Sequence, residues 1–68
     1  MNKSILTKRE KEVFELLIKN KTTAEIAGLL NIIEKTVRNH ISNSMQKLGV
    51  RGRASAVIEL LKLGELTI

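Results

Sequence analysis

The sequence has no cysteine, no proline and only one histidine among its 68 residues. Without cysteine the chain cannot form disulfides. His40 has no second histidine or carboxylate at ligand spacing, so it makes a poor metal ligand and a poor catalytic base. A chain of this length buries one small core, which leaves oligomerisation as the remaining source of added stability. We therefore expect one domain over residues 1–68, with no metal and no cofactor.

Long apolar runs are also missing. The N-terminus lacks the apolar stretch of a signal peptide, and no uncharged stretch approaches the length of a membrane span. A cytoplasmic location without membrane attachment follows as the expectation. The sequence has no glycine-rich phosphate loop and no nucleophile elbow, so no enzyme and no small-molecule ligand are predicted. Phe14, the only aromatic residue, lies on an apolar stripe, which disfavours base stacking of the single-strand-binding kind.

The positive charge is concentrated in one part of the chain. The formal net charge is +5, and the segment from Lys35 to Arg53 has five basic residues and no acidic one. The segment before it is nearly balanced, with six basic and five acidic residues in 1–34. A local surplus of this kind is expected where a polyanion docks on one limited surface. A solvated basic helix face is the alternative that charge alone leaves open.

Caps and apolar spacing predict an all-α fold with four helices. The first two begin at Ser/Thr-x-x-Glu capping boxes, Thr7 with Glu10 and Thr22 with Glu25. Gly49 supplies the left-handed position that ends the third helix, and Gly52 starts the fourth. The expected helices are 8–19, 23–31, 34–48 and 53–63.

The second and third predicted helices form a helix-turn-helix. They are joined by the short turn Asn31-Ile32-Ile33, and the longer third helix carries the basic face. Ala27, in the middle of the second helix, allows the third to cross closely over it. An ordinary helix-favouring alanine is the alternative reading of that residue.

A helical wheel divides the third predicted helix into a packing face and a polar face. Val37, Ile41, Ser44 and Leu48 share the packing side. The opposite side has no aliphatic and no acidic residue, and consists of side chains that can reach base edges or phosphates: Lys35, Arg38, Asn39, Ser42 and Gln46. Thr36, His40 and Asn43 lie on a flank between the two sides, where they suit contacts with phosphate oxygens.

The fourth predicted helix carries more apolar surface than one core contact needs. One apolar stripe consists of Ala56, Val57 and Leu60. A second stripe begins at Ala54 and continues with Ile58 and Leu61. We expect Ala54, Ile58 and Leu61 to be a dimer interface, because a two-fold contact adds stability and doubles the DNA contact. Simple exposure and wider burial in the core are the alternatives.

The sequence resembles the LuxR-type helix-turn-helix family over essentially its whole length. The segments that carry the resemblance are LTKREKEV (6–13), TAEIA (23–27), EKTVRNHI (34–41) and KLGV (47–50), with Arg53. The resemblance implies a four-helix LuxR-type domain in which the last helix dimerises. One departure is Ile33, which stands where the family usually has Ser or Thr, so an N-cap oxygen and a candidate phosphate contact are missing.

The resemblance also assigns roles to the third predicted helix. It matches Arg38, Asn39 and Ser42 to base-contacting positions, and Lys35, Thr36 and Asn43 to positions that contact the DNA backbone. With the wheel, the expected contacts to the DNA backbone are Lys35, Thr36, His40, Asn43, Gln46, Lys47 and Thr23.

The expected function is a dimeric transcription regulator that reads double-stranded promoter DNA, with RNA polymerase as a further candidate partner. Most members of the family carry this domain behind a receiver or ligand-binding domain. A match to the domain alone points to the stand-alone members of the family. This resemblance implies that the chain controls spore-coat genes in the mother cell late in sporulation. The alternative is a protein-interaction module that binds a partner regulator through the fourth helix.

Overall fold

Capping boxes begin the first two helices of the computed structural model, which describes residues 5–67. The four helices are α1 (Lys8–Leu17), α2 (Thr23–Leu30), α3 (Glu34–Leu48) and α4 (Arg53–Lys62). The Thr7 hydroxyl accepts from the Glu10 N–H at 3.1 Å, and the Glu10 carboxylate accepts from the Thr7 N–H at 2.9 Å. Thr22 and Glu25 make the same pair of bonds before α2. Both predicted capping boxes are confirmed.

All four helices end with the same backbone device. A residue follows each helix with positive φ: Asn20 (66°), Asn31 (57°), Gly49 (69°) and Gly64 (74°). The N–H of the following residue then donates a hydrogen bond to the carbonyl five residues earlier. Examples are Lys21 to the Leu16 carbonyl at 3.2 Å and Val50 to the Met45 carbonyl at 3.1 Å. These are Schellman closures, which satisfy the carbonyls that a helix leaves free at its end.

The closures correct three of the expected helix ends. The first helix was expected to reach residue 19 but ends at Leu17. Asn20 has the left-handed conformation, and residues 18–20 form the closing turn in place of a further turn of helix. The second and fourth end one residue earlier than expected, at Leu30 and Lys62. The bounds of α3 are those the sequence predicted, and Gly49 is its left-handed cap.

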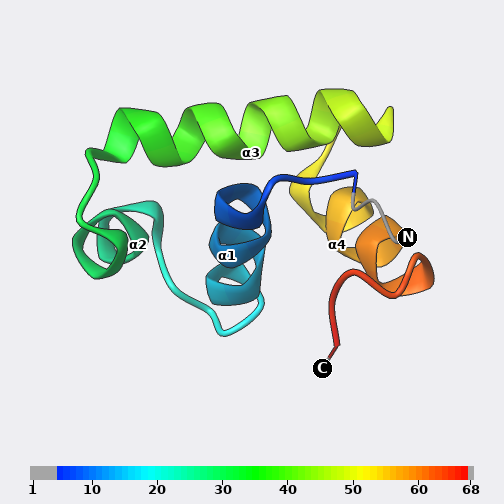
Figure 1. Cartoon of the computed structure of the whole chain (residues 1–68), viewed down its shortest axis with the longest axis horizontal. Coiled ribbons are helices and arrows are strands. Elements are labelled where there is room, and N and C mark those ends of the chain that lie inside the picture. Colours follow the sequence, from blue (N-terminus) through cyan, green and yellow to red (C-terminus); the bar gives the residue numbers. More distant parts are fainter. Residues whose placement is uncertain (1–4, 68) are drawn as a thin grey trace.

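Every helix contributes to one core. α3 contacts each of the other three helices, and in Figure 1 it lies across one side of the molecule with α1, α2 and α4 beneath it. The buried apolar side chains are Leu6, Val13, Phe14, Ile26, Ala27, Val37, Ile41, Ala56, Leu60 and Leu66. Leu6 and Leu66 come from the segments before α1 and after α4, so both ends of the described chain help to cover this core.

Candidate nucleic-acid interface

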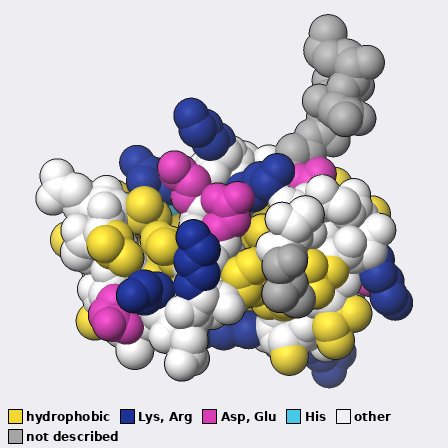
Figure 2. All heavy atoms as spheres, turned by 90° about the horizontal axis from the view of Figure 1, so that it is seen from below, with side chains coloured by type: hydrophobic (Ala, Val, Ile, Leu, Met, Phe, Trp, Pro, Cys, Tyr) yellow, Lys and Arg dark blue, Asp and Glu magenta, His cyan; other side chains and the backbone are white. Residues whose placement is uncertain are grey.

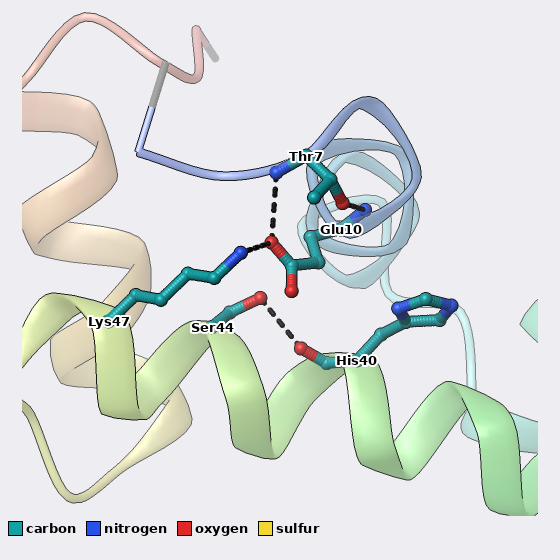
Figure 3. Close-up of polar contacts among 5 residues, drawn as sticks. All are labelled: Thr7, Glu10, His40, Ser44 and Lys47. Atoms are coloured by element: carbon teal, nitrogen blue, oxygen red, sulfur yellow. Dashed lines mark hydrogen bonds and ion pairs between the residues drawn. The ribbon is translucent and has the colours of Figure 1, made fainter. Parts of the chain in front are cut away.

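The buried side of α3 determines which of its residues face outward. Val37, Ile41 and Ser44 are almost completely buried. The Ser44 hydroxyl donates to the His40 carbonyl at 2.6 Å, so this polar group is satisfied inside the core (Figure 3). With that side fixed against the core, the other side of α3 must face solvent.

The outward face of α3 collects the residues expected to contact bases. Arg38, Asn39 and Ser42 are all exposed, as are Lys35, Asn43 and Gln46. An arginine, an amide and a hydroxyl are side chains that recognise base edges in the major groove. We therefore define the reading face as Lys35, Arg38, Asn39, Ser42 and Gln46.

Of the three flank residues, Asn43 is exposed, whereas the other two are less exposed than the reading face. Thr36, His40 and Thr23 are half-buried. The imidazole of His40 extends away from Ser44 and from the Glu10–Lys47 pair (Figure 3). The phosphate contacts expected of these residues stay predictions.

Lys47 has a structural partner that the sequence reasoning missed. Its ammonium donates to the Glu10 carboxylate at 2.6 Å, which joins the last turn of α3 to the capping box of α1 (Figure 3). Only 5% of the Glu10 side chain is exposed, against 38% of Lys47. Burial by itself raises the pKa of Glu10, but the Lys47 ammonium and the bonds with Thr7 outweigh it and hold that pKa below its usual value.

A second ion pair lies beside the reading face. Glu34 Oε2 accepts from Arg38 Nη1 at 2.9 Å and from the Thr23 hydroxyl at 2.6 Å. The sequence analysis gave Glu34 no role, although its spacing of four residues from Arg38 is that of an ion pair along a helix. Thr23 is thus occupied by this carboxylate in the protein alone.

The remaining basic residues of this region are free to meet a polyanion. Among residues 5–67, no carboxylate pairs with Lys35, Arg51 or Arg53. Figure 2 shows the side of the molecule away from α3, where acidic and basic side chains lie close together between apolar patches. The reading face has no acid of its own, so the asymmetry of charge favours α3 as the side that meets DNA.

The two predicted stripes of α4 have different environments. Ala56 and Leu60 are buried, and Val57 and Leu61 are partly buried against the same core. Ile58, with 53% of its surface exposed, and Ala54 remain open to solvent. Leu61 therefore belongs in part to the core of its own chain, whereas Ala54 and Ile58 are available for a partner.

The described part of the chain offers no other site of note. Residues 5–67 have no pocket and no group of three potential metal ligands. None of the helices within that range is long and apolar enough to cross a membrane.

Comparison with known proteins agrees with this geometry. Residues 4–60 match the family model described as bacterial regulatory proteins, luxR family. The chain is 69% identical to the spore germination protein GerE of Bacillus subtilis over 67 residues, which cover 98% of this chain and 90% of that protein. It is 48% identical to the transcriptional activator protein AnoR of Acinetobacter nosocomialis over 90% of its own length, but spans only 26% of that longer protein.

Solved structures show the same fold. The structure of the transcription factor GerE superposes with a TM-score of 0.93 and 58% identity, covering 96% of this chain and 97% of that one. The response regulator ChrA superposes with a TM-score of 0.85 and 27% identity, covering 97% of this chain and 33% of ChrA. The chain therefore belongs to the luxR family of bacterial regulatory proteins, with the four-helix helix-turn-helix fold that its sequence predicted.

Proposed function

We propose that this chain is a transcription regulator that reads a specific double-stranded DNA sequence by inserting α3 into the major groove. One observation carries the proposal: burial of Val37, Ile41 and Ser44 turns a face without acidic or aliphatic residues toward solvent. In helix-turn-helix proteins the second helix of the motif contacts base edges from the major groove. Arg38, Asn39 and Ser42 contact bases, and the surrounding polar and basic residues contact the DNA backbone.

The test separates base reading from backbone binding. Arg38→Ala is expected to weaken binding to the selected sequence by about 1 to 3 kcal/mol and to relax the preference at one base pair. Lys35→Ala is expected to weaken binding to all sequences. It should also reduce the slope of the logarithm of affinity against the logarithm of salt concentration by about one, the value of one phosphate contact. Binding is measured by fluorescence anisotropy on a duplex selected from a random pool and on a scrambled duplex, at two salt concentrations.

Lys19→Ala is the matched control, because it removes the same charge from the exposed loop after α1, on the side away from α3 (Figure 1). It is expected to leave the affinity for both duplexes and the salt dependence close to those of the unmodified chain. Equal losses on selected and scrambled duplexes for Arg38→Ala would contradict its role as a base reader. Weak binding of the unmodified chain to every sequence would instead favour a protein-interaction module that acts through α4.

The regulator acts as a dimer through α4, by the same proposal. Exposed Ile58 and Ala54 support it, since an apolar side chain on a small domain gains most from burial against a second copy. A two-fold dimer binds two half-sites, so the selected sequence should be a pseudo-palindrome. Light scattering that shows one copy both free and on DNA would overturn the dimer.

The similarity to GerE, whose name is that of a spore germination protein, supports a proposed role in sporulation. We place this chain in the cytoplasm of the mother cell, where it controls spore-coat genes late in sporulation, with RNA polymerase as a further partner. The test is expression of this chain in a Bacillus subtilis strain that lacks GerE. Restored coat-gene transcripts support the role, and a folded, expressed protein that restores none refutes it.

A further inference from the structure

One carboxylate joins both helices of the helix-turn-helix to the reading face. Glu34 Oε2 accepts from the Thr23 hydroxyl at 2.6 Å and from Arg38 Nη1 at 2.9 Å. Thr23 is the first residue of α2, Glu34 is the first residue of α3, and Arg38 lies one turn further along. Glu34 is also the only acidic residue from position 34 to position 53.

The ion pair between Arg38 and Glu34 contributes little to the stability of the fold. The Arg38 and Glu34 side chains are 55% and 42% exposed, and an exposed pair of this kind contributes little to folding. Meanwhile Glu34 places a negative charge beside a surface that meets phosphates, which opposes binding to any DNA. We therefore consider how Glu34 affects the guanidinium of Arg38.

The contact restricts Arg38 without occupying it. A guanidinium has five N–H donors in a rigid plane, and Glu34 engages Nη1 alone. The remaining donors suffice for the two parallel bonds that an arginine makes to guanine O6 and N7. The carboxylate is itself held by the Thr23 hydroxyl, so Arg38 is tied through Glu34 to a second helix and loses less freedom when it binds a base.

We propose that Glu34 is a positioning residue that sets the base selectivity of Arg38, an inference that rests on the proposed role of Arg38 as a base reader. It acts in two ways on the same contact. It aims the free edge of the guanidinium at the base, and its charge weakens binding to sequences where Arg38 finds no guanine. Glu34 thus increases discrimination at the expense of affinity for random DNA.

Glu34→Gln tests the proposal, since it removes the charge and keeps a side chain of the same shape that can still accept from Thr23. Arg38 should discriminate its preferred base pair from the others by roughly 5- to 150-fold in the unmodified protein. Glu34→Gln should reduce this ratio below that of the unmodified protein and tighten binding to random duplex. Both effects are measured by anisotropy on four duplexes that differ only at that base pair.

Glu12→Gln is the control, because it removes one negative charge from the comparable exposed Arg9–Glu12 pair on α1. It should leave the preference unchanged. The thermal midpoint of Glu34→Gln should stay within a few degrees of the unmodified value, so that a change in preference cannot be attributed to unfolding. If Glu34→Gln tightens binding to all four duplexes equally, Glu34 is only a repulsive charge and the positioning role is refuted.

Arg38→Ala distinguishes failure of this inference from failure of the proposed function. If Arg38→Ala keeps full preference at every base pair, Arg38 is no base reader and the proposed function is wrong in that respect. If Arg38→Ala abolishes the preference but Glu34→Gln retains it in full, only the inference about Glu34 fails. In the Arg38→Ala background, Glu34→Gln should change no preference further, and a further change would show that Glu34 acts by another route.

Discussion

Replacing Glu10 by glutamine should destabilise the domain more than any other loss of a single charge on α1. Glu10 Oε1 accepts from the Lys47 ammonium at 2.6 Å and from the Thr7 N–H at 2.9 Å. A hydrogen bond to a charged group contributes about 1.5 to 3 kcal/mol when buried. Glutamine keeps the oxygen that accepts from Thr7 but loses the charge, and Lys47, with 38% of its side chain exposed, recovers part of its hydration from water. We therefore expect a loss of about 1 to 2 kcal/mol.

The assay is thermal unfolding followed by helical circular dichroism at pH 7. For a domain of this size, a loss of about 1 to 2 kcal/mol lowers the midpoint by roughly 5 to 15 °C. Glu12→Gln, which breaks only the exposed pair with Arg9 at 3.5 Å, should change stability by less than about 0.5 kcal/mol. Glu10→Gln and Lys47→Met should not be additive, because each removes the same interaction.

The pH dependence gives a second check with a definite sign. The Lys47 and Thr7 contacts hold the pKa of Glu10 below its usual value in the folded protein. The folded state therefore gains stability from ionised Glu10 above the unfolded pKa, and loses it as pH falls through the lower folded pKa. The difference in the free energy of unfolding between the unmodified protein and Glu10→Gln should therefore become smaller below about pH 4.5. The reasoning is refuted if Glu10→Gln and Glu12→Gln have the same thermal midpoint. It is also refuted if the stability difference between the unmodified protein and Glu10→Gln stays constant down to about pH 3.

Three further predictions concern α3 and α4. Ile33→Ser should stabilise the domain by about 1 kcal/mol in chemical denaturation, because Ile33 is the N-cap of α3 and makes no side-chain cap bond; an unchanged midpoint would show that the cap is not limiting. Gly49→Ala should cost about 1 to 2 kcal/mol in the same assay, since φ is +69° and a side chain there is strained although it has room. Ile58→Glu should give a stable monomer in light scattering, whereas Leu61→Glu should also lower the thermal midpoint, because Leu61 packs partly on its own core; equal midpoints for the two would contradict that assignment.

The sequence predicted those parts of the fold that depend on residues close together in the chain. Thr7 with Glu10 and Thr22 with Glu25 are capping boxes because a hydroxyl and a carboxylate three residues apart meet at a helix start. The packing face of α3 was also predictable, down to buried Ser44, since a helical wheel needs only the period of the helix. Asn20 was missed because asparagine adopts positive φ only in some contexts, and the sequence gives no clear sign of which.

The contacts that sequence reasoning missed join residues from different helices. Lys47 lies 37 positions from Glu10, and only the packing of α1 against α3 brings the two together. Thr23 and Glu34 meet across the turn between α2 and α3 for the same reason. The Arg38–Glu34 pair is different, because its spacing along one helix could have been recognised. The outward direction of Arg38, Asn39 and Ser42 was predictable, but the Thr23 hydroxyl that holds Glu34 in place was not.

The four Schellman closures also bear on how fast the chain folds. Each closure joins backbone groups five residues apart, so every reversal of the chain after a helix is set by a local contact and needs no distant segment to be in place. Domains dominated by local contacts fold in microseconds to milliseconds, and a chain without proline has no slow prolyl isomerisation. Stopped-flow or temperature-jump refolding should therefore show one fast phase. Because Leu66, near the end of the chain, is part of the core, the complete fold forms only after the whole chain has been made, and it then forms within about milliseconds.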